Sequence, residues 1–300
     1  MSSSADALPS RDAIVATAGE TIARGSKSFA LASKLFDRET RARAWLLYAW
    51  CRACDDLADG QDLGFELRAV ADPMARLARI RDLTDRALAG QWVGEAAFDG
   101  LRLLCAEVPI PRAMIDEHLA GFALDAEGWR PSDEADLIRY CDHVAGVVGC
   151  MMAVLMGIPA DDAETLARAR DLGRAFQLAN IARDVREDAI GGRCYLPETW
   201  LQEMGLRPET LLENGAQTAM LTLRLADLAE GYEASARIGA RRLPFRSRWA
   251  VLAAAGIYGD IARKVRRRGE AALGARVITR KRAKLGWVAR ALWQARKGHA

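Results

Sequence analysis

The sequence lacks several features that would assign it to a familiar class of protein. Runs of alternating β-branched residues are scarce, and the amino-terminal segment has no apolar stretch after a basic one, so we expect no secretory signal. The longest uncharged run, residues 144–158, is shorter than the roughly 20 residues of a membrane span. We expect it to be a buried helix whose glycines permit close packing. The three histidines, His118, His143 and His299, share no metal-ligand spacing.

The six cysteines are scattered among helical patterns and suggest no compact disulfide framework. Cys51 and Cys54 make a CxxC pair, but no second pair, neighbouring histidine or preceding strand accompanies them. That context argues against a zinc site or thioredoxin-like chemistry. We expect reduced thiols in the core of a cytoplasmic protein.

What the sequence does have is helical periodicity. Apolar residues recur at helical spacing almost throughout the 300 residues, and the nine prolines fall between the periodic segments. The pattern predicts an all-α protein with a single domain over residues 1–300, of which 1–10 are disordered and 276–300 form a basic segment. The predicted helices cover residues 11–24, 38–58, 65–89, 95–107, 112–126, 134–156, 161–188, 216–240, 246–268 and 281–296.

The net charge of +3 is unevenly distributed. Residues 261–300 carry 13 Lys or Arg and one acid, Glu270, which leaves 30 basic and 39 acidic residues for the first 260. A basic terminal segment fits a phosphate-bearing or anionic-lipid partner, or a solvated helix face. Nucleic-acid binding is another reading, although no recognition motif supports it. The residues that a nucleic acid would contact are Arg266, Arg267, Arg268, Lys281 and Arg282.

A row of polar residues interrupts the apolar segment 172–190. Asn180, Asp184 and Asp188 recur at steps of four, so a helix places them on one face. A buried row of acids is costly without a cation or another partner. The row is therefore a candidate cation site, or else part of a buried ion-pair network.

A second set of polar residues lies upstream. Tyr48, Arg52, Asp55 and Asp59 step by four, three and four, so they share one helix face. Helical rise separates the Cα atoms of the two aspartates by about 6 Å, which lets both carboxylates reach one or two hard cations. Facing the downstream row, this helix would complete a carboxylate-lined pocket. The alternative is an ordinary surface pairing of Arg52 with an aspartate.

Three further segments each allow two interpretations. Residues 25–29, GSKSF, present hydroxyls, backbone N–H groups and a lysine to a phosphate, or cap a helix. Residues 140–149, YCDHVAGVVG, line a channel for a long apolar ligand, or pack closely against another helix. Residues 191–193, Gly-Gly-Arg, end the preceding helix, or form a mobile flap beside a metal site.

Together, YAWCRACDDLAD at residues 48–59 and AFQLANIARDVREDAIGGRCYLP at 175–197 resemble the two aspartate-rich signatures of the squalene and phytoene synthase family. GSKSF resembles the family's phosphate-contacting segment, YCDHVAGVVG its central helix, and residues 257–269 its late helix. The resemblance covers nearly the whole chain and implies the class I isoprenoid synthase fold, a helical bundle around a central active-site cavity. Compact length without a C-terminal anchor is similar to the bacterial phytoene synthases rather than to eukaryotic squalene synthases.

The resemblance also implies which residues carry the chemistry. The implied cofactors are Mg²⁺ or Mn²⁺, about three ions with diphosphate, and no NADPH is expected. The implied metal ligands are Asp55, Asp59, Asn180, Asp184 and Asp188. The implied catalytic residues are these five with Tyr48, Arg52 and Arg183. The implied substrate-binding residues are Ser26, Lys27, Ser28, Phe29, Tyr140, Val144, Gln177, Tyr258, Lys264 and Arg276.

The implied reaction joins two geranylgeranyl diphosphates head to head, through a cyclopropylcarbinyl diphosphate, to phytoene in carotenoid biosynthesis. Aromatic rings would stabilise the allylic cations, and departed diphosphate or a tyrosine hydroxyl would accept the last proton. A squalene or dehydrosqualene synthase using farnesyl diphosphate is the alternative enzyme. A non-catalytic helical scaffold or assembly factor is a distant alternative. The absence of a dinucleotide fingerprint does not separate the two enzymes.

The basic tail bears on the expected partners and location. Trp287 and Trp293 lie within it and suggest contact with an anionic membrane surface, with a solvated face as the alternative. We expect a cytoplasmic protein, peripheral on the inner face of the membrane. Besides two molecules of geranylgeranyl diphosphate, the expected partners are neighbouring carotenoid-pathway enzymes, and no nucleic acid is expected.

Overall fold

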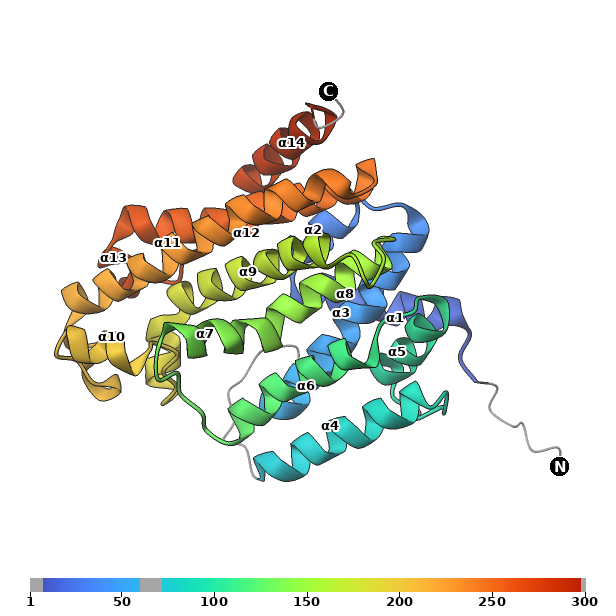
Figure 1. Cartoon of the computed structure of the whole chain (residues 1–300), viewed down its shortest axis with the longest axis horizontal. Coiled ribbons are helices and arrows are strands. Elements are labelled where there is room, and N and C mark those ends of the chain that lie inside the picture. The colour runs from blue at the N-terminus through green and yellow to red at the C-terminus, as the bar shows by residue number, and fades with distance from the viewer. Residues whose placement is uncertain (1–7, 60–71, 298–300) are drawn as a thin grey trace. The chain divides into compact units, whose positions relative to one another are not determined.

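The computed structural model describes residues 8–59 and 72–297, and within them every regular element is helical (Figure 1). The all-α prediction is therefore confirmed. The chain divides into two compact units, one made of Met1–Ser33 and Arg38–Pro109, the other of Lys34–Asp37 and Ile110–Ala300. The single-domain assignment stays a prediction.

The first unit is built around α3, which packs against α1, α4 and α5. Trp50 and Leu46 of α3 are fully buried, and the Trp50 indole donates to Thr84 Oγ1 at 3.4 Å, which ties α3 to α4. Ser10 caps α1 by accepting from the backbone N–H of Ala13. The helices of this unit are α1 (Arg11–Gly25), α2 (Lys27–Ser33), α3 (Arg38–Asp59), α4 (Pro73–Leu88) and α5 (Ala96–Glu107).

The second unit is organised by the long helix α9, which packs along α8, α11 and α12, while α14 packs on α12 (Figure 1). Its helices are α6 (Arg112–Ala126), α7 (Glu134–Cys141), the π-helical turn η1 (Asp142–Gly146), α8 (Val147–Leu155), α9 (Ala163–Ile190), α10 (Glu198–Glu203), the 3₁₀ turn η2 (Pro208–Thr210), α11 (Gly215–Gly239), the 3₁₀ turn η3 (Ala240–Arg242), α12 (Phe245–Arg268), α13 (Ala271–Gly274) and α14 (Lys281–Lys297).

Local chemistry sets both ends of α9. Asp162 caps the start, accepting from the backbone N–H and the hydroxyl of Thr165 at 3.0 and 2.7 Å. At the other end Gly192 has a φ of 73°, its N–H bonds to the Ala189 carbonyl, and the Arg193 N–H bonds to the Asp188 carbonyl at 2.8 Å. This is the Schellman arrangement, in which a residue with positive φ ends a helix. The Gly-Gly-Arg sequence is thus the helix stop that we offered as one of its two interpretations.

The stretch Glu134–Leu155 is, among the described residues, the one helix long and apolar enough to cross a membrane, and half of its apolar window is buried inside the protein. Its glycines face α9 closely. A Cβ on Gly149 would overlap the Ala169 carbonyl, and one on Gly173 of α9 would overlap the Ala145 carbonyl. Close packing is thus confirmed at Gly146 and Gly149, whereas Gly157 follows the helix and has nothing within 4 Å of a Cβ.

Most predicted helix limits agree with the structure within a few residues. The helix predicted from residue 65 begins at Pro73, because Asp72 has a φ of 52° and caps the backbone N–H of Ala75. Residues 65–71 of that predicted helix lie outside the described residues. So do residues 1–7 of the segment predicted to be disordered. The short helices α2, α10 and α13 were not predicted, since fewer than eight residues carry little periodic signal.

Candidate functional site

The polar row of α9 occupies one stripe of the helix. Asn180, Asp184 and Asp188 are half-buried along it, and Gln177 extends the row by one turn. The opposite side of α9 is buried in an apolar cluster that α11 and α12 complete. The buried residues of α9 in this cluster are Leu178, Ala179, Ile181, Ala182 and Val185. Burial of that side fixes the rotation of α9, and so holds the polar row away from the core.

Asp184 is the most strongly bound acid of the row. Arg183 donates to both of its carboxylate oxygens, and Arg276 donates to the same two oxygens at 2.9 and 3.1 Å. Burial favours the protonated form of Asp184, but these hydrogen bonds and charges outweigh it and hold its pKa below the usual value. Arg276 comes from the segment between α13 and α14, so a distant part of the chain completes the row.

Asp188 has the opposite electrostatic character. Burial and, after it, the negative charge of Asp184 raise the pKa of Asp188 to about 7. One turn of α9 thus holds one acid that is firmly ionised and another that is near its titration point at neutral pH. Among residues 8–59 and 72–297, no group of three or more His, Cys, Asp or Glu side chains gathers as a metal site. The row offers two carboxylates and one amide.

Aromatic rings lie on either side of the row. Phe176 of α9 stacks on Tyr258 of α12, with ring centroids 4.3 Å apart and planes 24° from parallel. Phe176 lies one helical turn before Asn180 on the same side of α9, which places this pair next to the row. The structure therefore brings Arg183 and the row together with Tyr258 and Arg276, which the sequence nominated from other stretches, and Phe176 joins them.

A second aromatic group surrounds a carboxylate that the sequence did not reveal. The Tyr140 ring stacks between Trp129 and Tyr195, with centroids 5.2 Å away on both sides. The Tyr140 hydroxyl donates to Asp125, 3.1 Å from each carboxylate oxygen, and the Tyr195 hydroxyl donates to the same group at 3.4 Å. Burial raises the pKa of Tyr140 well above its usual value, and the charge of Asp125 adds to this.

This aromatic group is electrostatically connected to the row. Burial raises the pKa of Tyr195, Asp125 contributes next, and the charge of Asp188 adds a smaller part. Asp125 and Trp129 lie outside the motifs that the sequence singled out, whereas Tyr195 lies near the end of the second signature, residues 175–197. The one signal that pointed toward them was Tyr195 in the stretch that follows the row.

The predicted residues of the first unit gather on α3. Arg52 Nη1 lies 3.7 Å from Asp55 and 3.9 Å from Asp56. The pairing of Arg52 with an aspartate, which was the alternative to a cation site, therefore does form. Tyr48 is half-buried one helical turn before Arg52; burial raises the pKa of Tyr48, and Arg52 opposes that rise. Asp59 is the last residue of α3, and its side chain lies outside the described part of the structure.

The GSKSF segment forms the break between α1 and α2. Ser26 Oγ accepts from the backbone N–H of Phe29 at 3.3 Å, which is the capping role. The Phe29 ring lies 6.1 Å from the Tyr48 ring, and a Cβ on Gly25 would fall 2.6 Å from the Tyr48 hydroxyl. Lys27 is exposed and Ser28 is half-buried. The segment is thus held beside α3 by Gly25 and Phe29.

Two predicted substrate-binding residues have structural contacts. Lys264 Nζ lies 2.5 Å from Asp260 and donates to the Ile278 carbonyl at 2.9 Å, so it anchors the segment that carries Arg276. Val144 sits in the π-helical turn, where a Cβ on Gly121 of α6 would lie 2.7 Å from its Cγ1. Close packing is therefore the observed environment of Val144.

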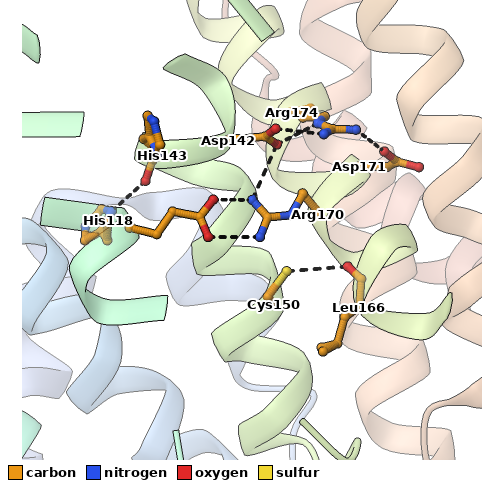
Figure 2. A network of polar contacts seen from close by, with 9 residues as sticks. His118, Asp142, His143, Cys150, Leu166, Arg170, Asp171 and Arg174 are labelled. Carbon is orange, nitrogen blue, oxygen red and sulfur yellow. Dashed lines mark hydrogen bonds and ion pairs between the residues drawn. The ribbon is translucent and has the colours of Figure 1, made fainter. Parts of the chain in front are cut away.

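Asp184 of the row itself forms ion pairs with Arg183 and Arg276, so the ion-pair alternative holds in part at the row. A second, half-buried ion-pair network lies along the first half of α9 (Figure 2). Arg170 makes a two-pronged pair with Glu117, and Arg174 makes another with Asp142 at 2.6 and 2.7 Å. Arg174 also donates to Asp171 at 3.0 Å. The network joins the first half of α9 to α6 and to the π-helical turn, which leaves the second half of α9 for the row.

All six cysteines are free, and four of them are buried. Burial raises the pKa of the thiols of Cys51 and Cys54, so neither is a reactive thiolate at neutral pH. The prediction of core cysteines is confirmed for the four buried ones, and their reduced state stays a prediction.

The comparison with known proteins decides the family. Residues 22–287 match the family described as squalene/phytoene synthase. The chain belongs to the squalene/phytoene synthase family. The 15-cis-phytoene synthase of Pantoea ananas is 47% identical over 264 residues, which cover 87% of this chain and 85% of that one. The 15-cis-phytoene synthase of Enterobacter agglomerans is 45% identical, covering 90% of this chain and 92% of that one.

Solved structures support the same fold. A dehydrosqualene synthase in complex with ligand has a TM-score of 0.83 at 26% identity, with 96% of this chain and 98% of that one covered. A squalene synthase from Alicyclobacillus acidocaldarius, at 22% identity, shares the fold with a TM-score of 0.75, covering 86% of this chain and 95% of that one. The predicted family and isoprenoid synthase fold are confirmed, as is the prediction of a prenyltransferase of the phytoene synthase type.

Proposed function

We propose that this squalene/phytoene synthase family member condenses two geranylgeranyl diphosphates head to head, through a cyclopropylcarbinyl diphosphate, to phytoene and two diphosphates. The observation that carries the proposal is the row of α9, where Asp184 and Asp188 lie beside Arg183 and Arg276. Ionising an allylic diphosphate requires positive charge around the leaving group and a dry surface around the cation. The row with its neighbouring aromatic rings supplies groups for both.

The donors of the row fit a hard divalent cation. Asp188 carries a raised pKa because it is buried next to an ionised neighbour, and a divalent cation held by Asp184 and Asp188 would offset that repulsion. When bound, Mg²⁺ or Mn²⁺ would stabilise the negative charge of the departing diphosphate. Asp184, Asp188 and the Asn180 amide are the residues of the row that would hold the ion. We assign Asp55 and Asp59 as further carboxylate ligands.

The arginines of the row would bind diphosphate directly. Arg183 and Arg276 present planar guanidinium groups that now donate to both oxygens of Asp184, and the same two-pronged geometry suits diphosphate oxygens. Their hydrogen bonds hold the Asp184 carboxylate in its ionised form before substrate arrives. Arg52, close to Asp55 on α3, would act in the same way there.

The stacked pair of Phe176 and Tyr258 would face the allylic cation. Aromatic faces stabilise a cation by several tenths to a few kcal/mol. Unlike a carboxylate, they do not attack the cation as nucleophiles. Because the pair is close to Arg183, the ionised carbon and its leaving group would be held by neighbouring parts of one surface.

The final proton would pass to Asp125 through Tyr140. In this step the C–H electron pair of the last cation becomes the new double bond, and the proton moves to the phenolic oxygen of Tyr140. The hydroxyl proton of Tyr140 moves along its 3.1 Å hydrogen bond to Asp125, so the tyrosine ends neutral and the carboxylate ends protonated. The raised pKa of Tyr140 excludes a resting phenolate, and a relay to a carboxylate needs none.

Substitutions on α9 test the proposal. Asp184→Asn should lower turnover of geranylgeranyl diphosphate at least about a hundredfold, while helicity and melting temperature stay nearly unchanged. Asp55→Asn should do the same. Glu187→Gln is the matched control, because Glu187 is an exposed acid on the same helix and outside the row. Retained activity in Asp184→Asn would refute the assignment of the row.

The alternative enzyme is a dehydrosqualene or squalene synthase. The similarity to the solved dehydrosqualene synthase, with a TM-score of 0.83, favours this alternative. The length of the isoprenoid chain accepted, fifteen or twenty carbons, separates the two functions.

We also propose a cytoplasmic location at the inner face of the membrane and association with neighbouring carotenoid-pathway enzymes. Co-fractionation of the untagged protein with membranes, and its release by salt, would test the location.

A further inference from the structure

Helix α14 presents an outward face that combines apolar and basic side chains. Leu285, Ala289 and Trp293 follow one another at steps of four and are all exposed. Leu285 is 53% exposed and Trp293 is 57% exposed, although both are large apolar residues. We call these three residues, together with the exposed Arg282, Arg290 and Arg296, the α14 face.

The inner side of α14 is firmly docked, so the direction of the α14 face is fixed (Figure 1). Trp249 of α12 donates from its indole to the Val288 carbonyl at 2.9 Å. Arg248 of α12 donates to the Ala295 carbonyl at 3.2 Å. Arg237 of α11 donates to Gln294 at 3.1 Å. The residues of α14 buried in the cluster with α12 are Ala291 and Ala295.

This docking corrects the tryptophan pair that the sequence suggested. Trp287 turns toward α12, where a Cβ on Gly256 would fall 2.5 Å from its ring and Arg263 lies 4.6 Å from the ring centre. Trp293 points outward, with Lys297 Nζ 3.9 Å from its ring. The large apolar residue that shares the exposed face with Trp293 is Leu285, and Trp287 is not on that face.

The segment that carries the α14 face bears charge of one sign. Residues 271–297 contain eight Lys or Arg and no Asp or Glu. Arg282 in the first turn and Arg296 in the last stand at the two ends of the apolar residues. Arginine side chains can extend toward phosphate groups while their stems follow apolar surface. A solvated helix ordinarily mixes both signs and has no need to expose a tryptophan and a leucine together.

We propose that the α14 face binds the surface of an anionic lipid bilayer. Leu285 and Trp293 enter the boundary between headgroups and acyl chains, and Arg282, Arg290 and Arg296 contact lipid phosphates. A helix lying in the plane of the interface, with apolar residues outward in its middle and basic residues at its ends, has this composition. Exposed Ile278, three residues before α14, adds apolar area to the same segment.

The membrane surface is structurally connected to the row of α9. Arg276, which binds Asp184, and Lys281, where α14 begins, are separated by one short segment. Thr279 fixes that segment by donating to the Ile257 carbonyl at 3.1 Å and to Asp260 at 3.0 Å. Lipid contact at α14 therefore occurs beside a segment that reaches the row, which suits an enzyme whose substrates and product partition into membranes. Only this last point rests on the proposed function.

Co-sedimentation of the full chain with vesicles, without substrate, tests the proposal. Wild type should bind vesicles of phosphatidylcholine with phosphatidylglycerol, should not bind phosphatidylcholine alone, and should be released by high salt. The double variant Leu285→Ser, Trp293→Ser should bind at least about tenfold more weakly, because both side chains lose their apolar burial. Charge reversal by Arg282→Glu with Arg296→Glu should abolish binding.

The matched control is the pair Met220→Ser, Ile238→Ser on α11, since both side chains are 54% exposed and lie outside the α14 face. This control should bind vesicles as wild type does. The Leu285, Trp293 variant should keep wild-type helicity and its turnover of detergent-dispersed substrate, so a failure of membrane binding is distinguishable from a failure of the proposed catalysis. Absence of binding to anionic vesicles would overturn the proposal, and so would equal binding by the variant. A change of oligomeric state in that variant with unchanged vesicle binding would make the face a protein interface instead.

Discussion

Arg276 donates from Nε and Nη2 to the two carboxylate oxygens of Asp184, across a separation of 92 residues in the chain. The contact joins the segment before α14 to the middle of the row on α9. Lys264 and Thr279 hold that segment through the Ile278 and Ile257 carbonyls. The row is thus completed by a residue whose position depends on the late helices, and this dependence can be measured.

Replacing Arg276 should weaken diphosphate binding more than it changes the fold. Arg276→Gln removes two charge-assisted donors and should raise KM for the diphosphate substrate about tenfold. Arg276→Lys should restore part of the loss, because the charge returns without the planar fork. Arg186→Gln is the control, an exposed arginine on α9 outside the row. Steady-state kinetics check the effect, and an unchanged KM in Arg276→Gln would contradict the role.

The proton relay predicts that Asp125 and Tyr140 act as one unit. Asp125→Asn and Tyr140→Phe should each lower kcat about a hundredfold, and the double variant should lose little more than either single one. Cations that wait longer for deprotonation should be captured by water, so alcohol by-products should rise. Tyr232→Phe, which alters a tyrosine on α11 that lies under Arg174, is the control. Additive losses with an unchanged product profile would show that the two residues act separately.

Gly173 of α9 packs closely against the π-helical turn, whereas Gly231 of α11 has open space beside it, so alanine should have opposite effects at the two glycines. Gly173→Ala should destabilise the protein by about 2 kcal/mol or more, because the new methyl group would overlap the backbone of Ala145. Gly231→Ala on α11 meets nothing within 4 Å and should stabilise by about 0.5–1 kcal/mol through helix propensity. Chemical denaturation of both variants measures the difference. Equal unfolding free energies for Gly173→Ala and Gly231→Ala would contradict the close packing at Gly173.

Buried His118 predicts a loss of stability in acid. Burial lowers its pKa from 6.5 to about 4, against the smaller opposing effects of its hydrogen bond to the His143 carbonyl and the charge of Glu117. The unfolded chain then binds a proton below pH 6.5 that the folded chain accepts only near pH 4. The stabilisation present above pH 6.5 should therefore fall by about 3 kcal/mol as the pH drops to 4.

The variant His118→Gln isolates this contribution, because glutamine is neutral throughout the range. Its unfolding free energy should fall less steeply than that of wild type between pH 6.5 and 4, measured by urea denaturation at each pH. Parallel pH profiles for the two proteins would show that His118 contributes nothing to the acid dependence.

Much of the fold was predictable because long amphipathic helices carry a strong periodic signal. The limits of α1, α3, α9 and α12 agree with the sequence interpretation within about two residues, as caps at Ser10 and Gly192 suggest they should. The π-helical turn at Asp142–Gly146 was not predictable, since it depends on tertiary pairs such as Asp142 with Arg174. Short helices were missed for lack of periodic signal.

The candidate site was predictable only where it rests on one helix. Steps of four along α9 place Asn180, Asp184 and Asp188 together without knowledge of the tertiary structure. Asp125 could not be predicted as a site residue from the sequence, because the fold brings the hydroxyls of Tyr140 and Tyr195 to its carboxylate. The outward direction of Trp293 likewise depends on how α14 docks, which no local pattern encodes.

We expect this chain to form phytoene from a twenty-carbon diphosphate, with the row of α9 as its metal-binding surface. The most direct measurement is product analysis of the purified protein with Mg²⁺ and either geranylgeranyl or farnesyl diphosphate, with and without NADPH. We predict phytoene from geranylgeranyl diphosphate, without need of NADPH, and none after metal chelation or in Asp184→Asn. No product from geranylgeranyl diphosphate, with turnover of farnesyl diphosphate alone, would contradict the account.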